Sequence, residues 1–345
     1  MVRELIRLIV VVSAAAALAG CSVLRGGREP SPPPPPPPLQ KITAVEARIP
    51  RRGELAPVVG QMQTYRIVPK DTLLDVARNA GLGFQEVKDA NRYVDEWIPP
   101  AGEDVAVPTR WILPAAPLQG IVVNVPEMRM FMFPQHTTPG QHVPVRTWAI
   151  AIGADETPSP TGTFRITSKD KNPTWYVPDS IYRTMAKPRR VIPPGPNNPM
   201  GEYRIRLSKG LYSIHGTDTP WAIGRQTTHG CIRLYPEDIG ELYDMVTPAT
   251  SGTLVYEPVK LGMDGGQVYV EVHEDVYKRF PSLEREAFRL VRQARVESRV
   301  DPERLRQAVR DRRGVPTDIT RDGGSPPPLR TEVPADAGGR RASSR

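Results

Sequence analysis

The chain contains 345 residues, and because domains usually hold roughly 100 to 200 residues, this length allows two folded units with flexible ends. Its 40 prolines cluster near the N-terminus and in the C-terminal tail, which indicates tethers rather than core in those regions. The formal net charge of +8 suits an anionic polymer or lipid head groups. No nucleic-acid-binding motif is present, so nucleic acid is not expected as a partner.

The first 20 residues are predicted to be an export signal. Two arginines precede an apolar run, Leu8–Ala19, that is shorter than the about 20 residues needed to span a bilayer as a helix. The segment ends in LAGC, which resembles the lipobox of bacterial lipoproteins. This resemblance implies that residues 1–20 are removed and that Cys21 is acylated as a membrane anchor. Ser22 after the anchor then favours a periplasmic protein on the inner leaflet of the outer membrane; an uncleaved anchor helix is the alternative.

Residues 21–59 are predicted to form a linker. Seven consecutive prolines, Pro32 to Pro38, favour polyproline II, which rises about 3.1 Å per residue and makes a semi-rigid spacer. Recognition of this run by a partner that binds proline-rich segments is the alternative. With Cys21 acylated, Cys231 would be the one remaining thiol and would have no disulfide partner within the chain.

Residues 60–110 are predicted to fold as a small α+β module with the order strand, helix, helix, strand. Asp71 or Thr72 can cap the first helix, and the second is expected over 84–91. This segment resembles a LysM domain, a module that binds glycans containing N-acetylglucosamine. It departs from the usual pattern at Lys70, where the family has Gly, and at Arg92, where it has Pro. The resemblance implies contact with glycan strands, and a rigid spacer is the alternative.

Residues 118–260 are predicted to form a mainly β catalytic domain. The runs 121–125 and 128–133 flank a Pro-Glu turn and indicate a hairpin, and helical runs are few. A mostly antiparallel sandwich or barrel-like architecture is therefore expected. Residues 261–321 are predicted to be an appendage of one strand and helices, with Asp301 as an N-cap and Gly314 as a C-cap. Residues 322–345 have the composition of a disordered tail.

The stretch 214–234, IHGTDTPWAIGRQTTHGCIRL, contains the side chains best suited to chemistry. A cysteine thiol, with a pKa near 8.5, needs a neighbouring base or positive field to become a nucleophile, and His215 and His229 are nearby in sequence. If Cys231 begins a strand, it shares one face with Arg233, while Ile232 points to the core. Gly230 directly precedes Cys231 and has no side chain to shield the backbone, so main-chain N–H groups there can approach an oxyanion.

The motifs IHGT and THGCIRL resemble the signature of the L,D-transpeptidase catalytic domain of the YkuD type. The stretches NVPEMRMFMF, TPSPTGTF and PGPNNPMGEY are also typical of that family, so the resemblance covers about 120–258. It implies that Cys231 is the nucleophile and that His215 is the general base, oriented by the carbonyl of Gly216. It places His229 in the cysteine loop and oxyanion hole, together with Gly230, and assigns the positioning of the donor stem to Arg233. Thr228 and Trp221 are further residues expected to bind substrate.

The resemblance also implies the reaction, which needs no cofactor. Cys231 attacks the third residue of a peptidoglycan stem tetrapeptide, usually diaminopimelate, and releases D-Ala. The resulting thioester passes to an amine, either on a second stem or on a lysine of an envelope lipoprotein. Transfer to water would make the protein a carboxypeptidase.

Two alternatives from other classes remain open on the residues alone. His229 and Cys231, joined by His215 or His273, could ligate zinc, although no second metal-binding pattern accompanies them. A peptidoglycan-binding lipoprotein without catalytic activity is the other alternative.

Overall fold

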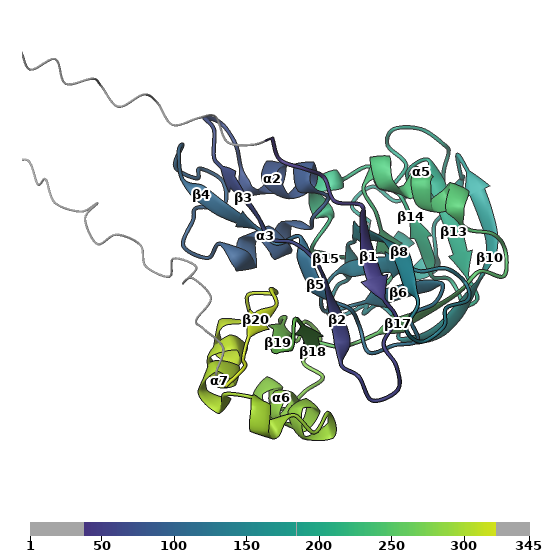
Figure 1. Cartoon of the computed structure of the whole chain (residues 1–345). Coiled ribbons are helices and arrows are strands. Elements are labelled where there is room, and N and C mark those ends of the chain that lie inside the picture. Colours follow the sequence, from purple (N-terminus) through teal and green to yellow (C-terminus); the bar gives the residue numbers. More distant parts are fainter. Residues whose placement is uncertain (1–37, 184, 322–345) are drawn as a thin grey trace, which may run out of the picture. The chain divides into compact units, whose positions relative to one another are not determined.

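The computed structural model describes residues 38–183 and 185–321 (Figure 1). The predicted signal peptide, Cys21, the prolines up to Pro37 and the tail 322–345 lie outside these residues, so lipid anchoring and tail disorder stay predictions. Within the described ranges, no helix combines the length and the apolar character required to cross a membrane.

The module over 60–110 has the predicted order of elements. It consists of β3 (Gln63–Arg66), α2 (Leu73–Ala80), α3 (Phe84–Ala90) and β4 (Asp104–Val107), with β3 and β4 antiparallel. Thr72 is the N-cap of α2 and forms a capping box with Asp75, an arrangement worth about 1 kcal/mol. Gly81 ends α2 in the left-handed conformation. The prediction of a cap at Asp71 or Thr72 is therefore confirmed for Thr72.

Both departures from the LysM pattern have structural counterparts. Lys70 has a φ of 80°, a conformation that favours glycine, so the backbone geometry is kept without the glycine. Arg92 donates to Asp89 Oδ1 and to the carbonyl of Arg312, both at 3.0 Å. The residue that replaces the usual proline thus connects the module to the C-terminal helices.

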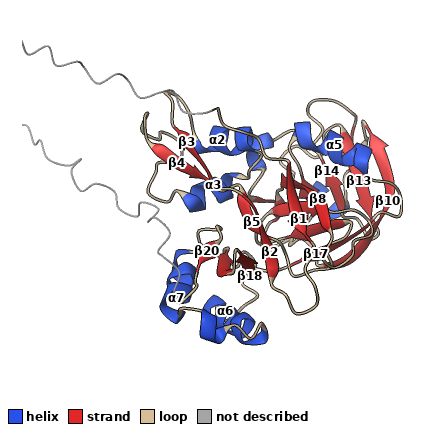
Figure 2. Ribbon diagram, viewed as in Figure 1, coloured by secondary structure: helices blue, strands red, loops and turns tan. Residues whose placement is uncertain are grey.

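A nine-stranded sheet carries most of the catalytic segment, in the order β1-β8-β7-β6-β17-β10-β13-β14-β16. Strands are drawn in red in Figure 2. The strands of this sheet are β1 (Ala44–Arg48), β6 (Ile121–Asn124), β7 (Arg129–Met132), β8 (His142–Ala149), β10 (Gly162–Lys171), β13 (Tyr203–Leu207), β14 (Ser213–His215), β16 (Ile232–Arg233) and β17 (Ser251–Val255). The predicted hairpin is present, with Asn124 opposite Arg129. Most pairs are antiparallel as expected, but β6–β17 and β14–β16 are parallel.

The two parallel pairs add a detail to the predicted mostly antiparallel domain. A parallel pair needs a crossover connection, and residues 216–231 provide one between β14 and β16. The crossover contains η1 (Pro220–Ala222) and β15 (Gln226–Thr228), and β15 pairs with β9 (Ile152–Gly153). Strand periodicity carries no information on which strands become neighbours, so the sequence could not reveal this connection.

A second, five-stranded sheet has the order β20-β19-β18-β2-β5. Its strands are β2 (Ala56–Gly60), β5 (Arg110–Ile112), β18 (Val259–Asp264), β19 (Gln267–Val272) and β20 (Thr317–Asp318). Helix α6 (Leu283–Gln293) packs against β18, and α7 (Pro302–Asp311) packs against β19. Asp301 is the N-cap of α7 as predicted. The C-cap is Arg312 with a φ of 44°, not Gly314, whose N–H donates to the carbonyl of Val272.

The remaining elements are short or cover an edge. They are β11 (Trp175–Tyr176), α4 (Asp179–Tyr182), β12 (Val191–Ile192), α5 (Pro236–Met245) and η2 (Glu297–Arg299). Strands β11 and β12 pair with each other, and α5 packs on β13.

The predicted linker boundary at residue 59 is wrong. Strand β1 pairs with β8 of the large sheet, and β2 pairs with β5 and β18 of the second sheet. Ala47 and Val59 are buried in the core. These strands are only five residues long and gain their stability from partners distant in sequence, so their local sequence did not distinguish them from the proline-rich linker beside them. The boundary at residue 260 also divides β18.

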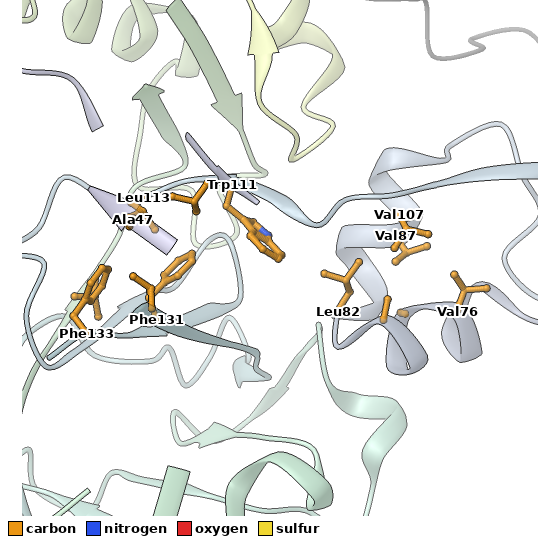
Figure 3. Packing of buried hydrophobic residues seen from close by; sticks show 14 of the residues in the cluster. Ala47, Val76, Leu82, Val87, Val107, Trp111, Leu113, Phe131 and Phe133 are labelled. Carbon is orange, nitrogen blue, oxygen red and sulfur yellow. The ribbon is translucent and has the colours of Figure 1, made fainter. Parts of the chain in front are cut away.

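One hydrophobic cluster joins the small module to the nine-stranded sheet. Leu82 and Val87 come from the module, Phe131 comes from β7, and Trp111 of β5 lies between them (Figure 3). The buried Arg129 of β7 reaches Glu86 of α3, with Nη2 to Oε2 at 2.8 Å. The module and the sheet therefore share a core.

Candidate active site

Strands β14 and β16 place the candidate residues on a common face. The register pairs Ile214 with Ile232 and His215 with Arg233. Both isoleucines are buried in the core, so His215 and Arg233 point to the opposite face. Cys231 directly precedes β16 and, two residues from Arg233, shares that face. The prediction that Ile232 points to the core is confirmed.

His215 is a buried, neutral imidazole. Its Nδ1 lies 2.7 Å from the carbonyl oxygen of Gly216, and an N–H at Nδ1 donating to this carbonyl puts the lone pair of the neutral ring on Nε2. Burial lowers the pKa of His215 to about 3, and the charge of Arg233 acts in the same direction, while the hydrogen bond to Gly216 opposes it. The ring is therefore unprotonated at neutral pH.

Cys231 is half-buried and is the free cysteine of the described residues. Burial raises the pKa of its thiol, against a main-chain hydrogen bond from Ser213 and the positive charges of Arg233 and Arg204. The same two arginines act on the pKa of His215. The resting state is thus a thiol near a neutral imidazole rather than a thiolate–imidazolium pair, so attack requires proton transfer to a base.

The low pKa of His215 predicts how acylation of Cys231 depends on pH. An imidazole with an ordinary pKa of about 6.5 would lose activity roughly 25-fold between about pH 7 and pH 5. With a pKa of about 3, His215 stays unprotonated over this range, so the acylation rate should not fall from this cause. The measurement is the rate of Cys231 acylation by a carbapenem across that range.

Folding must be followed in the same samples. The unfolded chain binds a proton at His215 below about pH 6.5 and the folded chain does not, so this residue's contribution to stability is lost as the pH falls from 6.5 towards 3. Arg233→Gln removes one cause of the low pKa of His215. In this variant, the loss of acylation rate at acidic pH should therefore begin at a higher pH than in wild type. If the acylation rate of folded wild-type protein fell with a midpoint near pH 6.5, the low pKa assigned to His215 would be contradicted.

Hydrogen bonds within the cysteine loop fix its shape. Thr228 Oγ1 donates to the carbonyl of Cys231 at 2.6 Å and accepts from the N–H of Gly230 at 3.1 Å. Gly230 has a φ of +95°, and a Cβ there would lie 2.5 Å from the ring of Tyr212, so only glycine fits. The buried Thr228 thus positions the loop, and its expected role in substrate binding stays a prediction.

The main-chain donors available for an oxyanion are fewer than expected. Because the N–H of Gly230 is already bonded to Thr228, the candidate donors narrow to the N–H groups of His229 and Cys231. The side chain of His229 is exposed, in contrast to that of His215.

Two residues that the sequence analysis did not single out, Ser159 and Tyr277, support the cysteine loop through hydrogen bonds. Ser159 Oγ donates to the carbonyl of Gly230 at 3.1 Å and accepts from the N–H of Gly153 at 2.9 Å. The hydroxyl of Tyr277 donates to the carbonyl of Gly153 and accepts from the N–H of Ser159. Ser159 lies in the TPSPTGTF stretch, which is typical of the family. Tyr277 lies in the loop after β19, and no sequence signal pointed to it.

Arg233 has the features of an anion-binding side chain. Its guanidinium group forms no ion pair within 4.0 Å among residues 38–183 and 185–321, and its Nη1 lies 3.4 Å from Thr219 Oγ1. Burial lowers its pKa, and its buried Nε has no hydrogen-bond partner. It lines a pocket of about 530 Å³ together with Trp221, and substrate binding by these two side chains stays a prediction.

The zinc alternative that includes His273 has no support in this arrangement. His273 Nε2 lies 2.7 Å from Glu271 Oε1, in a buried group with Glu127. The ammonium group of Lys260 lies between the two carboxylates, 2.7 Å from Glu127 and 2.8 Å from Glu271. A cation of the chain itself therefore already pairs with both carboxylates, and His273 is bonded to one of them.

Known proteins match this chain over both the site and the regions around it. The family model for the L,D-transpeptidase catalytic domain, YkuD, matches residues 119–268. The probable L,D-transpeptidase YcfS of Escherichia coli is 32% identical over 284 residues, which cover 77% of this chain and 86% of that protein. The probable L,D-transpeptidase ErfK/SrfK of Salmonella typhimurium is 31% identical over 290 residues, covering 80% and 92%. A solved catalytic domain of an E. faecium L,D-transpeptidase is 22% identical with a TM-score of 0.31, covering 41% of this chain and 100% of its own.

Proposed function

Because this chain belongs to the L,D-transpeptidase family of the YkuD type, we propose that Cys231 is its nucleophile and that its donor substrate is the tetrapeptide stem of peptidoglycan. The observation that carries this proposal is that the neighbouring strands β14 and β16 bring a half-buried thiol, Cys231, and a buried imidazole, His215, to the same face of the sheet. The charges of Arg233 and Arg204 act on the pKa of both groups. In this state a base can remove the thiol proton at the moment of attack.

The first half-reaction forms a thioester. The thiol proton moves to Nε2 of His215 while the sulfur of Cys231 bonds to the carbonyl carbon of the third stem residue, diaminopimelate. The N–H groups of His229 and Cys231 stabilise the resulting oxyanion, and loss of one such donor typically costs about 10²- to 10³-fold in rate. When the C–N bond breaks, the imidazolium returns its proton to the leaving nitrogen, and D-Ala departs.

The second half-reaction transfers the acyl group. A neutral amine attacks the thioester, its proton passes through His215, and the thiol of Cys231 is regenerated. The acceptor is the side-chain amine of a second stem or a lysine of an envelope lipoprotein. Water in its place would give a carboxypeptidase. Arg233 and Trp221 line the pocket where the donor binds, and the guanidinium group is suited to a carboxylate of the stem.

The rest of the chain is proposed to hold this chemistry at the cell wall. Acylation of Cys21 would anchor the protein to the inner leaflet of the outer membrane, facing the periplasm. The module over 60–110, which resembles LysM, would contact glycan strands. Since this module shares a core with the nine-stranded sheet, deleting it would expose Trp111 and Arg129, so its role must be tested by point substitution.

The proposal is tested with a purified muropeptide that carries a tetrapeptide stem. Wild-type protein should release D-Ala, and Cys231→Ala should release none. The mass of the products then identifies a cross-link between two stems or a shortened tripeptide, and adding an envelope lipoprotein tests protein anchoring. Binding to peptidoglycan sacculi without any D-Ala release by the wild type would support the non-catalytic alternative and reject the proposal.

A further inference from the structure

The pocket beside Arg233 has walls from two parts of the chain. On one side lie Leu74 and Trp97 of the small module. On the other side lie Thr219, Trp221 and Arg225 of the crossover between β14 and β16, with Arg233 itself. Trp97 of the module therefore lines the same pocket as Arg233, the candidate substrate-binding residue of the active site.

Close main-chain contacts hold these walls together. The N–H of Phe84 donates to the carbonyl of Ile223, and the hydroxyl of Tyr235 donates to the carbonyl of Leu82 at 3.0 Å. Gly224 has a φ of +80°, and a Cβ there would lie 2.3 Å from the nitrogen of Phe84, so the two backbones can approach only through a glycine. The two walls of the pocket are thus fixed relative to each other by these contacts.

The chemistry of the walls favours an anionic ligand with aliphatic parts. The indoles of Trp97 and Trp221 are 51% and 59% exposed, and they offer apolar surfaces. The Nε atoms of Arg225 and Arg233 are buried and have no hydrogen-bond partner. Arg225 stacks on Phe84 at 3.9 Å, and Asp218 is a carboxylate whose charge acts on Arg233 without an ion pair within 4.0 Å. A neutral sugar could stack on an indole, whereas a peptide carboxylate could also form charged hydrogen bonds with both guanidinium groups.

We propose that this pocket binds a carboxylate-bearing segment of the stem peptide, with Trp97 as a specificity-determining residue supplied by the module. The proposal rests on the proposed function, because it concerns the substrate of the same site. The carboxylate pairs with Arg233 and Arg225, and the aliphatic part of the stem lies against Trp97 and Trp221. The module then contributes directly to recognition of the donor peptide.

The test compares Trp97→Ala with wild type on a sugar-free tetrapeptide stem. KM should rise at least fivefold with little change in kcat, and this effect should exceed any effect on acylation by a carbapenem, which lacks the stem. Trp97→Phe, which keeps an aromatic surface and the stacking on Phe84, should recover most of the affinity. Ile98→Ala is the matched control, because Ile98 is adjacent, 82% exposed and absent from the pocket lining.

The outcomes separate this inference from the proposed function. If wild-type protein releases no D-Ala from any stem, the proposed function fails. If wild type is active and Trp97→Ala has an unchanged KM, only the inference fails. If the KM rises only for a stem linked to its disaccharide, the pocket holds sugar and the peptide assignment is overturned.

Discussion

Replacing His215 by glutamine is expected to slow acylation of Cys231 by about 10²- to 10⁴-fold, the usual contribution of a positioned general base. The thiol has a raised pKa, so little thiolate exists at neutral pH without proton transfer to a base. Glutamine fills similar space but cannot accept the proton. The measurement is the single-turnover rate of acylation by a carbapenem, with circular dichroism to verify the fold.

The control for this prediction is His229→Ala. The side chain of His229 is exposed, and the proposed mechanism uses only its main-chain N–H, which alanine retains. Its effect on the acylation rate should be less than about tenfold, well below that of losing a general base. A near-normal rate in His215→Gln together with a large loss in His229→Ala would transfer the role of base to His229.

Replacing Glu86 by alanine is expected to lower the free energy of unfolding by about 3 to 5 kcal/mol, because it leaves the buried charge of Arg129 unpaired. Arg129 is fully buried, donates to both carboxylate oxygens of Glu86 and lies 4.5 Å from the ring of Trp111. Glu86 also accepts from the N–H of Gly83 at 2.7 Å. Urea unfolding at neutral pH measures the change.

A second ion pair between the same parts of the chain provides the matched control. Arg78 of α2 donates to both carboxylate oxygens of Glu237 at the start of α5, but the two side chains are 45% and 37% exposed. Exposed pairs contribute about 0 to 1 kcal/mol, so Glu237→Ala should have a small effect. Equal losses in Glu86→Ala and Glu237→Ala would show that burial of the first pair is not what makes it important.

Local signals in the sequence predicted local structure well. Thr72 and Asp301 cap helices because a side-chain oxygen and the first backbone N–H groups are only two or three residues apart. The face shared by Cys231 and Arg233 followed from strand alternation alone. Gly314 was wrong as a C-cap because Arg312 adopts the left-handed conformation, a choice that helix propensity does not reveal.

Features that depend on distant partners could not be predicted from the sequence. Strands β1 and β2 are stable only beside strands far along the chain, so they resembled the linker that precedes them. Arg129 alternates with apolar residues as a solvent-facing strand residue would, yet it is buried against Glu86. Thr228 and Tyr277 act on the cysteine loop through hydrogen bonds that only the tertiary fold defines.

The most direct measurement of the central claim is the intact mass of the protein after incubation with a carbapenem, whose strained lactam carbonyl reacts with an activated thiol. Wild-type protein should gain the mass of one acyl group, and peptide mapping should locate it on Cys231, while folded Cys231→Ala should remain unmodified. Unmodified wild-type protein, or an equal adduct on Cys231→Ala, would contradict the assignment of Cys231 as the nucleophile.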